Sequence, residues 1–319
     1  MHFFNRKDLV LKMAVNEIKL EDLTAVGNLE ILANQVVEGF ITGLHKSPFH
    51  GFSVEFAEHR LYNAGDSVKN VDWKLFARTD KLFAKRFEEE TNLRCQLVID
   101  CSSSMFYPQG RLNKFQFSAM AAAAIINLLK KQRDAFGLTL FAEDIEVQTP
   151  AKSTQVHQKY IYHQLENYLD KPSTLKKTKL SANLHQIAEN THKRAMIVLF
   201  SDLFESSSDQ QETEEIFSAL QHLKYNKHEV IIFNVLEQKH EIDFDFDNRP
   251  YHFIDSESGE QLKLNPSQYT EEYKSKILSF KKDLDSKCSQ LKIDLVNAYL
   301  EEGFNPTLNS WLIKRNKMG

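Results

Sequence analysis

Cysteine, glycine and proline are all scarce in this chain of 319 residues. The 3 cysteines are too few for a disulfide framework, and no Cys-x-x-Cys or Cys/His spacing indicates a zinc site. With 10 glycines and 7 prolines, collagen-like and low-complexity classes are excluded. Such cysteine usage is typical of a protein from a reducing compartment.

Long apolar runs are absent as well. The longest, residues 120–129, covers about half of the ~20 residues that a membrane helix needs. Residues 1–23 carry scattered charges in place of the continuous apolar core of a secretory signal. We therefore expect a cytoplasmic protein.

The chain has no strong excess of charge of either sign. Its 40 Lys and Arg stand against 44 Asp and Glu, which gives a formal net charge of −4. This balance argues against a general nucleic-acid or anionic-membrane binder. Hydrophobic residues make up 42% of the chain, enough for a sizeable core.

From residue 94 onward, apolar runs alternate with helical patterns. The runs that predict strands lie at 95–100, 136–142, 195–202, 228–236 and 291–300. The helices are predicted at 114–133, 156–169, 180–192, 213–224, 273–290 and 306–315. Because such runs indicate strands covered on both faces, we predict a doubly wound α/β fold with a mostly parallel sheet.

Two further segments differ from this pattern. Residues 1–90 are predicted to form an N-terminal segment, helical at about 20–46 and β-rich at 51–90, ahead of an α/β domain at 91–319. Within that domain, residues 237–270 read as an insertion of acidic loop and short strands. The alternating Asp and Phe at 243–247 predict a strand with one acidic face.

Polar loops follow two of the predicted strands. Asp100, Ser102 and Ser104 follow the first, and Asp202 follows another; Thr178 precedes the helix predicted at 180. Ligands of open parallel sheets lie at the carboxyl ends of the strands, and oxygen donors of this kind suit Mg²⁺ or Mn²⁺. Taken alone, the serines also fit a helix N-cap and the acidic residue a solvated loop.

Asp100-x-Ser102-x-Ser104, Thr178-x-Leu180 and the strand-terminal Asp202 resemble the metal-ion-dependent adhesion site of von Willebrand factor type A domains. A segment upstream resembles the hallmark of the bacterial domain-of-unknown-function 58 family. Its matching residues are Arg60, Tyr62, Gly65, Asp66, Asp72, Trp73, Lys74 and Arg78.

The resemblance implies a von Willebrand A-like fold and a docking function. Ser102, Ser104 and Thr178 would hold Mg²⁺ or Mn²⁺ directly, and Asp100 and Asp202 directly or through water. A partner protein would supply a carboxylate as the sixth ligand. Family members usually accompany a MoxR-type AAA+ ATPase, which makes this chain an expected adaptor or assembly factor of such an ATPase. Many members carry N-terminal membrane helices that this chain lacks, which favours a cytoplasmic member.

Several alternatives remain open at the sequence level. Thr174 competes with Thr178 as the loop ligand, because the family's Gly-Gly-Thr is replaced by Lys176-Lys177-Thr178. The cluster from Arg60 to Arg78 serves as a structural ion-pair network or as a partner surface, with Trp73 expected to pack. The competing class of function is a metal-dependent phosphoesterase or nuclease that uses Asp100 and Asp202.

Overall fold

The structure is a computed structural model that describes residues 29–43, 58–61, 73–86, 93–169, 178–203 and 210–318. The chain divides into two compact units. One contains helix α3 (Leu29–Gly43) together with residues 93–318, and the other contains the described elements between residues 45 and 92.

The smaller unit contains a two-stranded sheet and a helix. Strand β1 (Glu58–Leu61) pairs antiparallel with β2 (Phe83–Arg86), and between them in sequence lies the short helix α4 (Trp73–Thr79). The sequence predicts the strand that begins near residue 82 but not the helix, because seven residues are too few to display a helical period.

The larger unit is built on a six-stranded mixed sheet. Across the sheet the strands are β10 (Asp294–Tyr299), β7 (Glu229–Leu236), β6 (Met196–Ser201), β3 (Arg94–Asp100), β4 (Ala135–Phe141) and β5 (Ile145–Gln148). The first five run parallel, and β5 pairs antiparallel with β4 at the edge. The predicted mostly parallel α/β class is confirmed.

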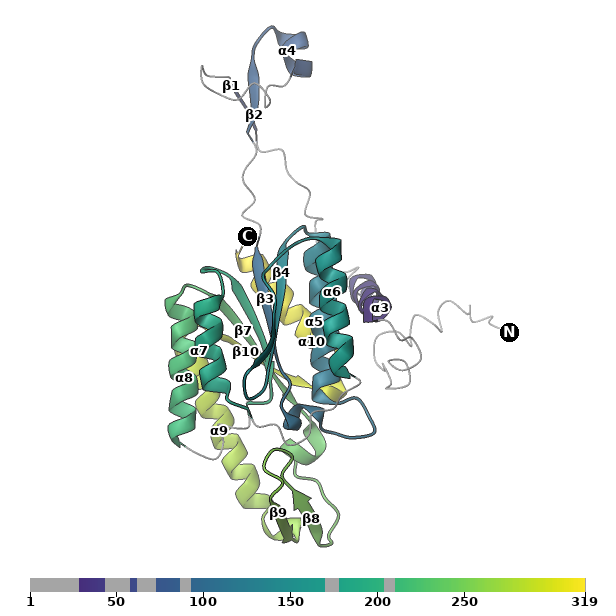
Figure 1. The fold of residues 1–319 in the computed structure, drawn as a ribbon, viewed down its shortest axis with the longest axis vertical. Coiled ribbons are helices and arrows are strands. Elements are labelled where there is room, and N and C mark those ends of the chain that lie inside the picture. The colour runs from purple at the N-terminus through teal and green to yellow at the C-terminus, as the bar shows by residue number, and fades with distance from the viewer. Residues whose placement is uncertain are drawn as a thin grey trace, which may run out of the picture. The chain divides into compact units, whose positions relative to one another are not determined.

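Helices cover both faces of this sheet (Figure 1). One face packs against α5 (Lys114–Lys131), α6 (Gln155–Leu169) and α10 (Asn305–Met318), and α3 packs against α5 and α6. The other packs against α7 (Leu180–Asn190), α8 (Gln210–Tyr225) and α9 (Thr270–Gln290). Along β3, Leu97 and Ile99 enter the first core and Val98 the second, which explains why the strand is apolar without alternation.

Helix α3 packs against the α/β unit. Leu29, Leu32 and Val37 are buried in the core that α5 and α6 share, and the Asn127 amide donates a 2.7 Å hydrogen bond to Asn34 Oδ1. The sequence prediction grouped this helix with the β-rich segment in residues 1–90. Its buried apolar face places it with residues 93–318 instead.

The predicted insertion forms an outlying subdomain. A π-helical turn (Gln238–Ile242) is followed by the hairpin of β8 (Tyr251–Ile254) and β9 (Gln261–Leu264), then by a 3₁₀ turn (Pro266–Gln268). Figure 1 shows the hairpin beyond the end of the sheet at which β3 finishes. The acidic strand predicted at 243–247 is wrong: Phe244 adopts a positive φ of 48°, which breaks the extended backbone.

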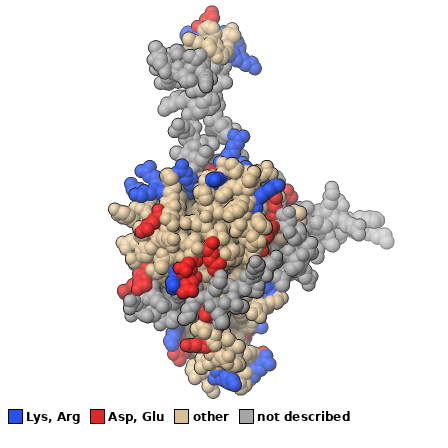
Figure 2. All heavy atoms as spheres, in the orientation of Figure 1, with Lys and Arg blue, Asp and Glu red and all other residues tan. Residues whose placement is uncertain are grey.

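Within the described residues, no helix has both the length and the apolar character that crossing a membrane requires. Figure 2 shows Lys and Arg side chains gathered along the edge of the α/β unit where its central strands begin. Exposed basic residues at this edge include Arg94, Arg133, Lys152 and Arg194. A group of buried acidic residues lies at the opposite end of the sheet, where the central strands finish.

Candidate metal centre

Asp100 is the centre of a buried polar group at the end of β3. Its side chain is 1% exposed. The Ser102 backbone N–H donates a 2.9 Å hydrogen bond to Asp100 Oδ1, and the Ser201 hydroxyl donates one of 2.9 Å to Oδ2. Because β3 and β6 are neighbours in the sheet, Ser201 arrives beside Asp100 at the carboxyl edge. The carboxylate is therefore held in one orientation.

The predicted hydroxyl ligands gather around this carboxylate. The Thr178 hydroxyl lies 3.4 Å from Asp100 Oδ1, and Ser102 Oγ lies 3.1 Å from Ser104 Oγ. Ser102 and Thr178 are buried, whereas Ser104 is half-buried. The fold thus brings four of the five predicted ligands into one group linked by short contacts, and Thr174 lies outside the described residues.

Asp202, the fifth predicted ligand, follows β6 and is 4% exposed. Burial, and after it the negative charge of Asp202, raises the pKa of Asp100 from 3.8 to about 7. A buried carboxylate whose ionisation is opposed by a neighbouring negative charge marks a place where a cation would be stabilised.

Lys114 is a site residue that the sequence analysis missed. Its Nζ lies 2.6 Å from Asp202 Oδ2 and 2.7 Å from Glu241 Oε1, and its side chain is 1% exposed. Burial alone would lower the pKa of Lys114, but the charges of Asp202 and Glu241 raise it, so the ammonium stays charged. The available signal was a lysine in the first turn of α5, where the helix dipole disfavours a cation.

The segment after β7 supplies two more carboxylates, those of Glu237 and Glu241. The Glu237 carboxylate accepts hydrogen bonds from Arg111 and, at 2.6 Å, from the His240 backbone N–H. Glu241 Oε2 accepts a 2.9 Å hydrogen bond from the Glu237 N–H, and the Tyr273 hydroxyl donates to the Glu241 carbonyl. Burial raises the pKa of Glu241, and Asp202 adds to this effect while Lys114 opposes it.

A further acidic side chain, Glu257, reaches the group from the turn between β8 and β9. Its carboxylate accepts hydrogen bonds from the Ser104 hydroxyl and from the Thr178 backbone N–H. Burial first, and then the charge of Asp202, raise the pKa of Glu257. No pattern in the sequence marks this glutamate, because its place depends on the path of the insertion.

The donor set fits a hard divalent cation. Three hydroxyls and two carboxylates supply oxygen, the kind of ligand that Mg²⁺ and Mn²⁺ prefer. The buried ammonium of Lys114 supplies one positive charge against several carboxylates, which leaves the group acidic. Among the described residues, no three His, Cys, Asp or Glu side chains converge as a metal site.

The predicted cluster in the smaller unit is only partly described. Arg60 lies in β1 opposite Ala84, and Trp73, Lys74 and Arg78 lie on α4. Trp73 is 57% exposed and contacts Phe76 edge to face, so more than half of this side chain, which was expected to pack, is exposed. The remaining predicted members lie outside the described residues: Tyr62, Gly65, Asp66 and Asp72.

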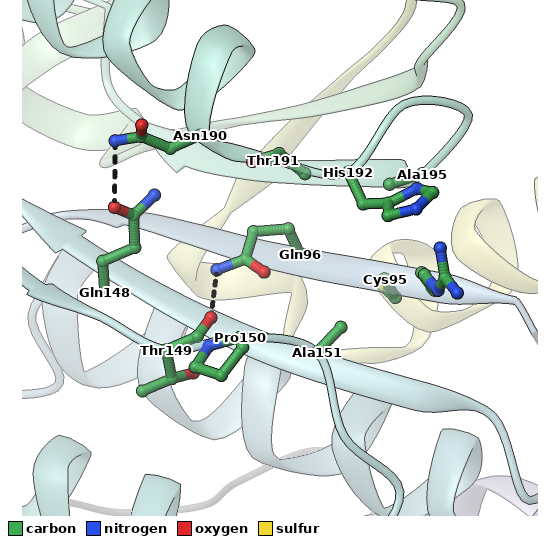
Figure 3. Close-up of a pocket in the computed structure, with 11 residues that line it drawn as sticks. Cys95, Gln96, Gln148, Thr149, Pro150, Ala151, Asn190, Thr191, His192 and Ala195 are labelled. Carbon is green, nitrogen blue, oxygen red and sulfur yellow. Dashed lines mark hydrogen bonds between the residues drawn. The ribbon is translucent and has the colours of Figure 1, made fainter.

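A cavity of about 470 Å³ lies at the opposite end of the sheet from this group, near the beginning of β3 (Figure 3). Two hydrogen bonds join side chains within the cavity wall: the Gln96 amide donates to the Thr149 carbonyl at 3.3 Å, and Asn190 Nδ2 donates to Gln148 Oε1 at 3.2 Å. This cavity is separate from the predicted ligands.

The larger unit is an α/β fold with a mostly parallel sheet and helices on both faces. Residues 58–281 match the model of the family described as "Protein of unknown function DUF58", and the chain belongs to that family.

Curated relatives include uncharacterized proteins of Mycobacterium bovis and Mycobacterium tuberculosis. Each is 26% identical over 178 residues, which cover 56% of this chain and 56% of the relative. The chain therefore spans about half the length of the curated relatives that it matches.

Similar solved structures include BatB from Bacteroides thetaiotaomicron, 13% identical, with a TM-score of 0.41 over 71% of this chain and 98% of that one. The VWA domain of SpRpn10 is also 13% identical, with a TM-score of 0.35 over 69% of this chain and 94% of that domain.

Proposed function

We propose that this chain is a protein-interaction module that binds a partner's carboxylate through Mg²⁺ or Mn²⁺. The observation that carries the proposal is the grouping of three hydroxyls, those of Ser102, Ser104 and Thr178, with two buried carboxylates at the carboxyl edge of the sheet. A cation held mainly by neutral hydroxyls keeps much of its charge, so it favours an additional anionic ligand.

The composition of the site favours docking over hydrolysis. A metal ion that generates hydroxide needs a ligand set and a base suited to deprotonating water. Here the ligands are mostly hydroxyls, and the nearest basic side chain, Lys114, is engaged by Asp202 and Glu241 and stays charged. When bound, the ion would supply electrostatic attraction for a carboxylate, while the residues around it orient that carboxylate and limit access of water.

The proposed partner is a MoxR-type AAA+ ATPase, for which the chain would act as adaptor or assembly factor. Support for this partner comes from the family membership and the hallmark residues.

A cytoplasmic location is part of the same proposal. It is supported by the cysteines: all three are buried, and none forms a disulfide.

The test is a capture experiment with extract from cells that naturally express the protein. Wild type and Ser102→Ala are each used as bait with Mg²⁺ and with excess EDTA. The proposal predicts that an ATPase of the AAA+ class is retained only by wild type with Mg²⁺. Equal recovery in all four samples would contradict it.

A further inference from the structure

The turn between β8 and β9 is built so that Glu257 has a fixed position. Asp255 Oδ1 accepts a 3.0 Å hydrogen bond from the Glu257 N–H, and its other oxygen accepts one from the Ser258 N–H at 3.2 Å. Gly259 closes the turn with a φ of 73°, a conformation that favours glycine, and donates to the Asp255 carbonyl at 3.0 Å. The backbone on either side of Glu257 is thereby held.

The base of the hairpin is anchored by aromatic packing. Phe246 lies 5.3 Å from Phe253 of β8, and Phe244 stacks at 4.2 Å on Tyr273 of α9, as measured between ring centroids. Phe246 also lies 4.9 Å from His240, in the π-helical turn that carries Glu241. The hairpin and the acidic turn next to Lys114 therefore belong to one packed subdomain.

The tip of this subdomain meets the predicted ligands. Glu257 accepts hydrogen bonds from the Ser104 hydroxyl and from the backbone of Thr178, and it is half-buried. These two residues belong to different segments, the loop after β3 and the loop before α7. One carboxylate thus joins both hydroxyl-bearing loops of the site.

We propose that Glu257 is an internal ligand of this site, occupying the position that a partner's carboxylate would otherwise take. The proposal rests on the metal-dependent docking function proposed above and adds its regulation. In the isolated chain, Glu257 completes the oxygen ligands of the cation and the hairpin covers it. A partner carboxylate then binds only when Glu257 is displaced.

A purely structural role for Glu257, as a hydrogen-bond acceptor that ties the hairpin to the two loops, makes a different prediction. In that case the affinity for the cation would not depend on its charge. Glu260, an exposed glutamate in the same turn, provides a matched control.

Calorimetric titration of Mg²⁺ into the full chain separates these roles. We expect Glu257→Gln to bind Mg²⁺ about tenfold more weakly than wild type, because one anionic ligand is lost. Glu260→Gln should remain within about twofold of wild type. Circular dichroism of each variant establishes that the fold is retained, and the isosteric Gln variant decides the question if Glu257→Ala does not fold.

Chemical rescue provides the second readout. Glu257→Ala leaves room for a small carboxylate, so sodium acetate should restore most of its Mg²⁺ affinity, whereas sodium chloride at equal ionic strength should not. Acetate should leave wild type unchanged, since Glu257 already occupies the position.

Failure of this inference differs from failure of the proposed function. If wild type binds Mg²⁺ and Ser102→Ala does not, but Glu257→Gln binds as wild type does, the internal-ligand proposal is wrong and the metal site stands. If wild type binds no Mg²⁺, or Ser102→Ala binds it equally well, the proposed function is wrong and the role of Glu257 as a ligand falls with it.

Discussion

At the scale of single residues, the buried charge of Lys114 depends on the carboxylates around it. It lies fully buried in the first turn of α5, where the helix dipole disfavours a positive charge. Two carboxylates, from Asp202 and Glu241, compensate. The lysine therefore acts as a permanent cation next to the proposed exchangeable one, and the two should partly substitute for each other electrostatically.

Replacement of Lys114 by Met tests whether the divalent cation can substitute for the buried ammonium group. With EDTA present, we expect a loss of roughly 3–5 kcal/mol of unfolding free energy, because buried carboxylates lose their partner. Mg²⁺ should then raise the midpoint of urea unfolding more in Lys114→Met than in wild type. Lys131→Met, at the exposed end of the same helix, is the control and should change stability by at most about 1 kcal/mol. An equal response of Lys114→Met and wild type to Mg²⁺ would contradict the account.

In the metal-free protein, Asp100 should make the free energy of unfolding depend on pH, and the sign of that dependence follows from its pKa. Its pKa of about 7 in the folded chain lies above 3.8, the ordinary value expected on unfolding. Between these values the folded state holds a proton that the unfolded state releases, so stability falls as pH rises from about 4 to 7. The slope from this group is at most about 1.4 kcal/mol per pH unit.

Urea unfolding in EDTA between about pH 5 and 7.5 measures this slope. Asp100→Asn should remove the contribution, so the difference between the two proteins isolates it from other titrating groups. Saturating Mg²⁺ should reduce the slope in wild type, because the cation favours the ionised carboxylate. A wild-type slope equal to that of Asp100→Asn in EDTA would show that the carboxylate is not perturbed.

The part of the site that is predictable from sequence is the part encoded locally. Asp100, Ser102 and Ser104 are close in sequence, and the parallel sheet brings Asp202 to the same edge. For Lys114 the only signal was a lysine at the start of a predicted helix, and Glu241 and Glu257 gave none, because all three meet the site through tertiary contacts of a helix and an insertion. Whether the predicted ligands bind metal stays a prediction.

At the scale of elements, three helices end without the glycine that usually follows them. Arg133, Lys227 and Lys292, each two residues beyond the last residue of α5, α8 or α9, adopt positive φ values of 61°, 62° and 54°. The residue after each donates its N–H back across the last turn, as in the hydrogen bonds from Asp134 to Leu129 and from Ile293 to Cys288. Basic residues therefore stand at three positions where glycine is common. Their left-handed backbone is strained, and their positive charge interacts favourably with the helix dipole.

Lys292→Gly should therefore stabilise the protein. Relief of the left-handed strain outweighs the greater freedom of glycine in the unfolded chain, and we expect a net gain of about 0.5–1 kcal/mol in unfolding free energy. Lys292→Ala retains the strain and should give no gain. The midpoint of urea unfolding for the three proteins checks this, and a less stable Gly variant would contradict it.

The predictable elements are those with long apolar runs or a full helical period. Strands β3, β4, β6, β7 and β10 were predicted because their neighbours bury both faces. Strand β5 was missed, because its four residues alternate between half-buried and exposed at the sheet edge. In the insertion, alternation of Asp and Phe predicted a strand, but Phe244 and Phe246 pack against each other at 5.1 Å instead.

At the scale of the whole molecule, the chain combines an α/β unit with a smaller unit that carries hallmark residues. The buried carboxylates Asp100 and Asp202 lie where the central strands end, and Figure 2 shows basic side chains gathered where those strands begin. The proposed docking function assigns the partner's carboxylate to the end of the sheet that would hold the cation.

The competing class of function has its own check. If the site were a phosphoesterase, purified wild type with Mg²⁺ or Mn²⁺ would hydrolyse bis(p-nitrophenyl) phosphate and Asp100→Ala would not. We expect no turnover above the protein-free rate in either sample, because the site is suited to holding a carboxylate. Robust turnover that disappears in Asp100→Ala would favour the enzyme.

The most direct test of the central claim is the stoichiometry of Mn²⁺ binding, measured by electron paramagnetic resonance of the free ion. Wild type should remove one Mn²⁺ per chain from solution, Mg²⁺ should compete for that site, and Ser102→Ala should bind at least tenfold more weakly while its circular dichroism is unchanged. Wild type that leaves all Mn²⁺ free, or Ser102→Ala that binds as wild type does, would contradict the claim that these hydroxyls and carboxylates form a metal centre.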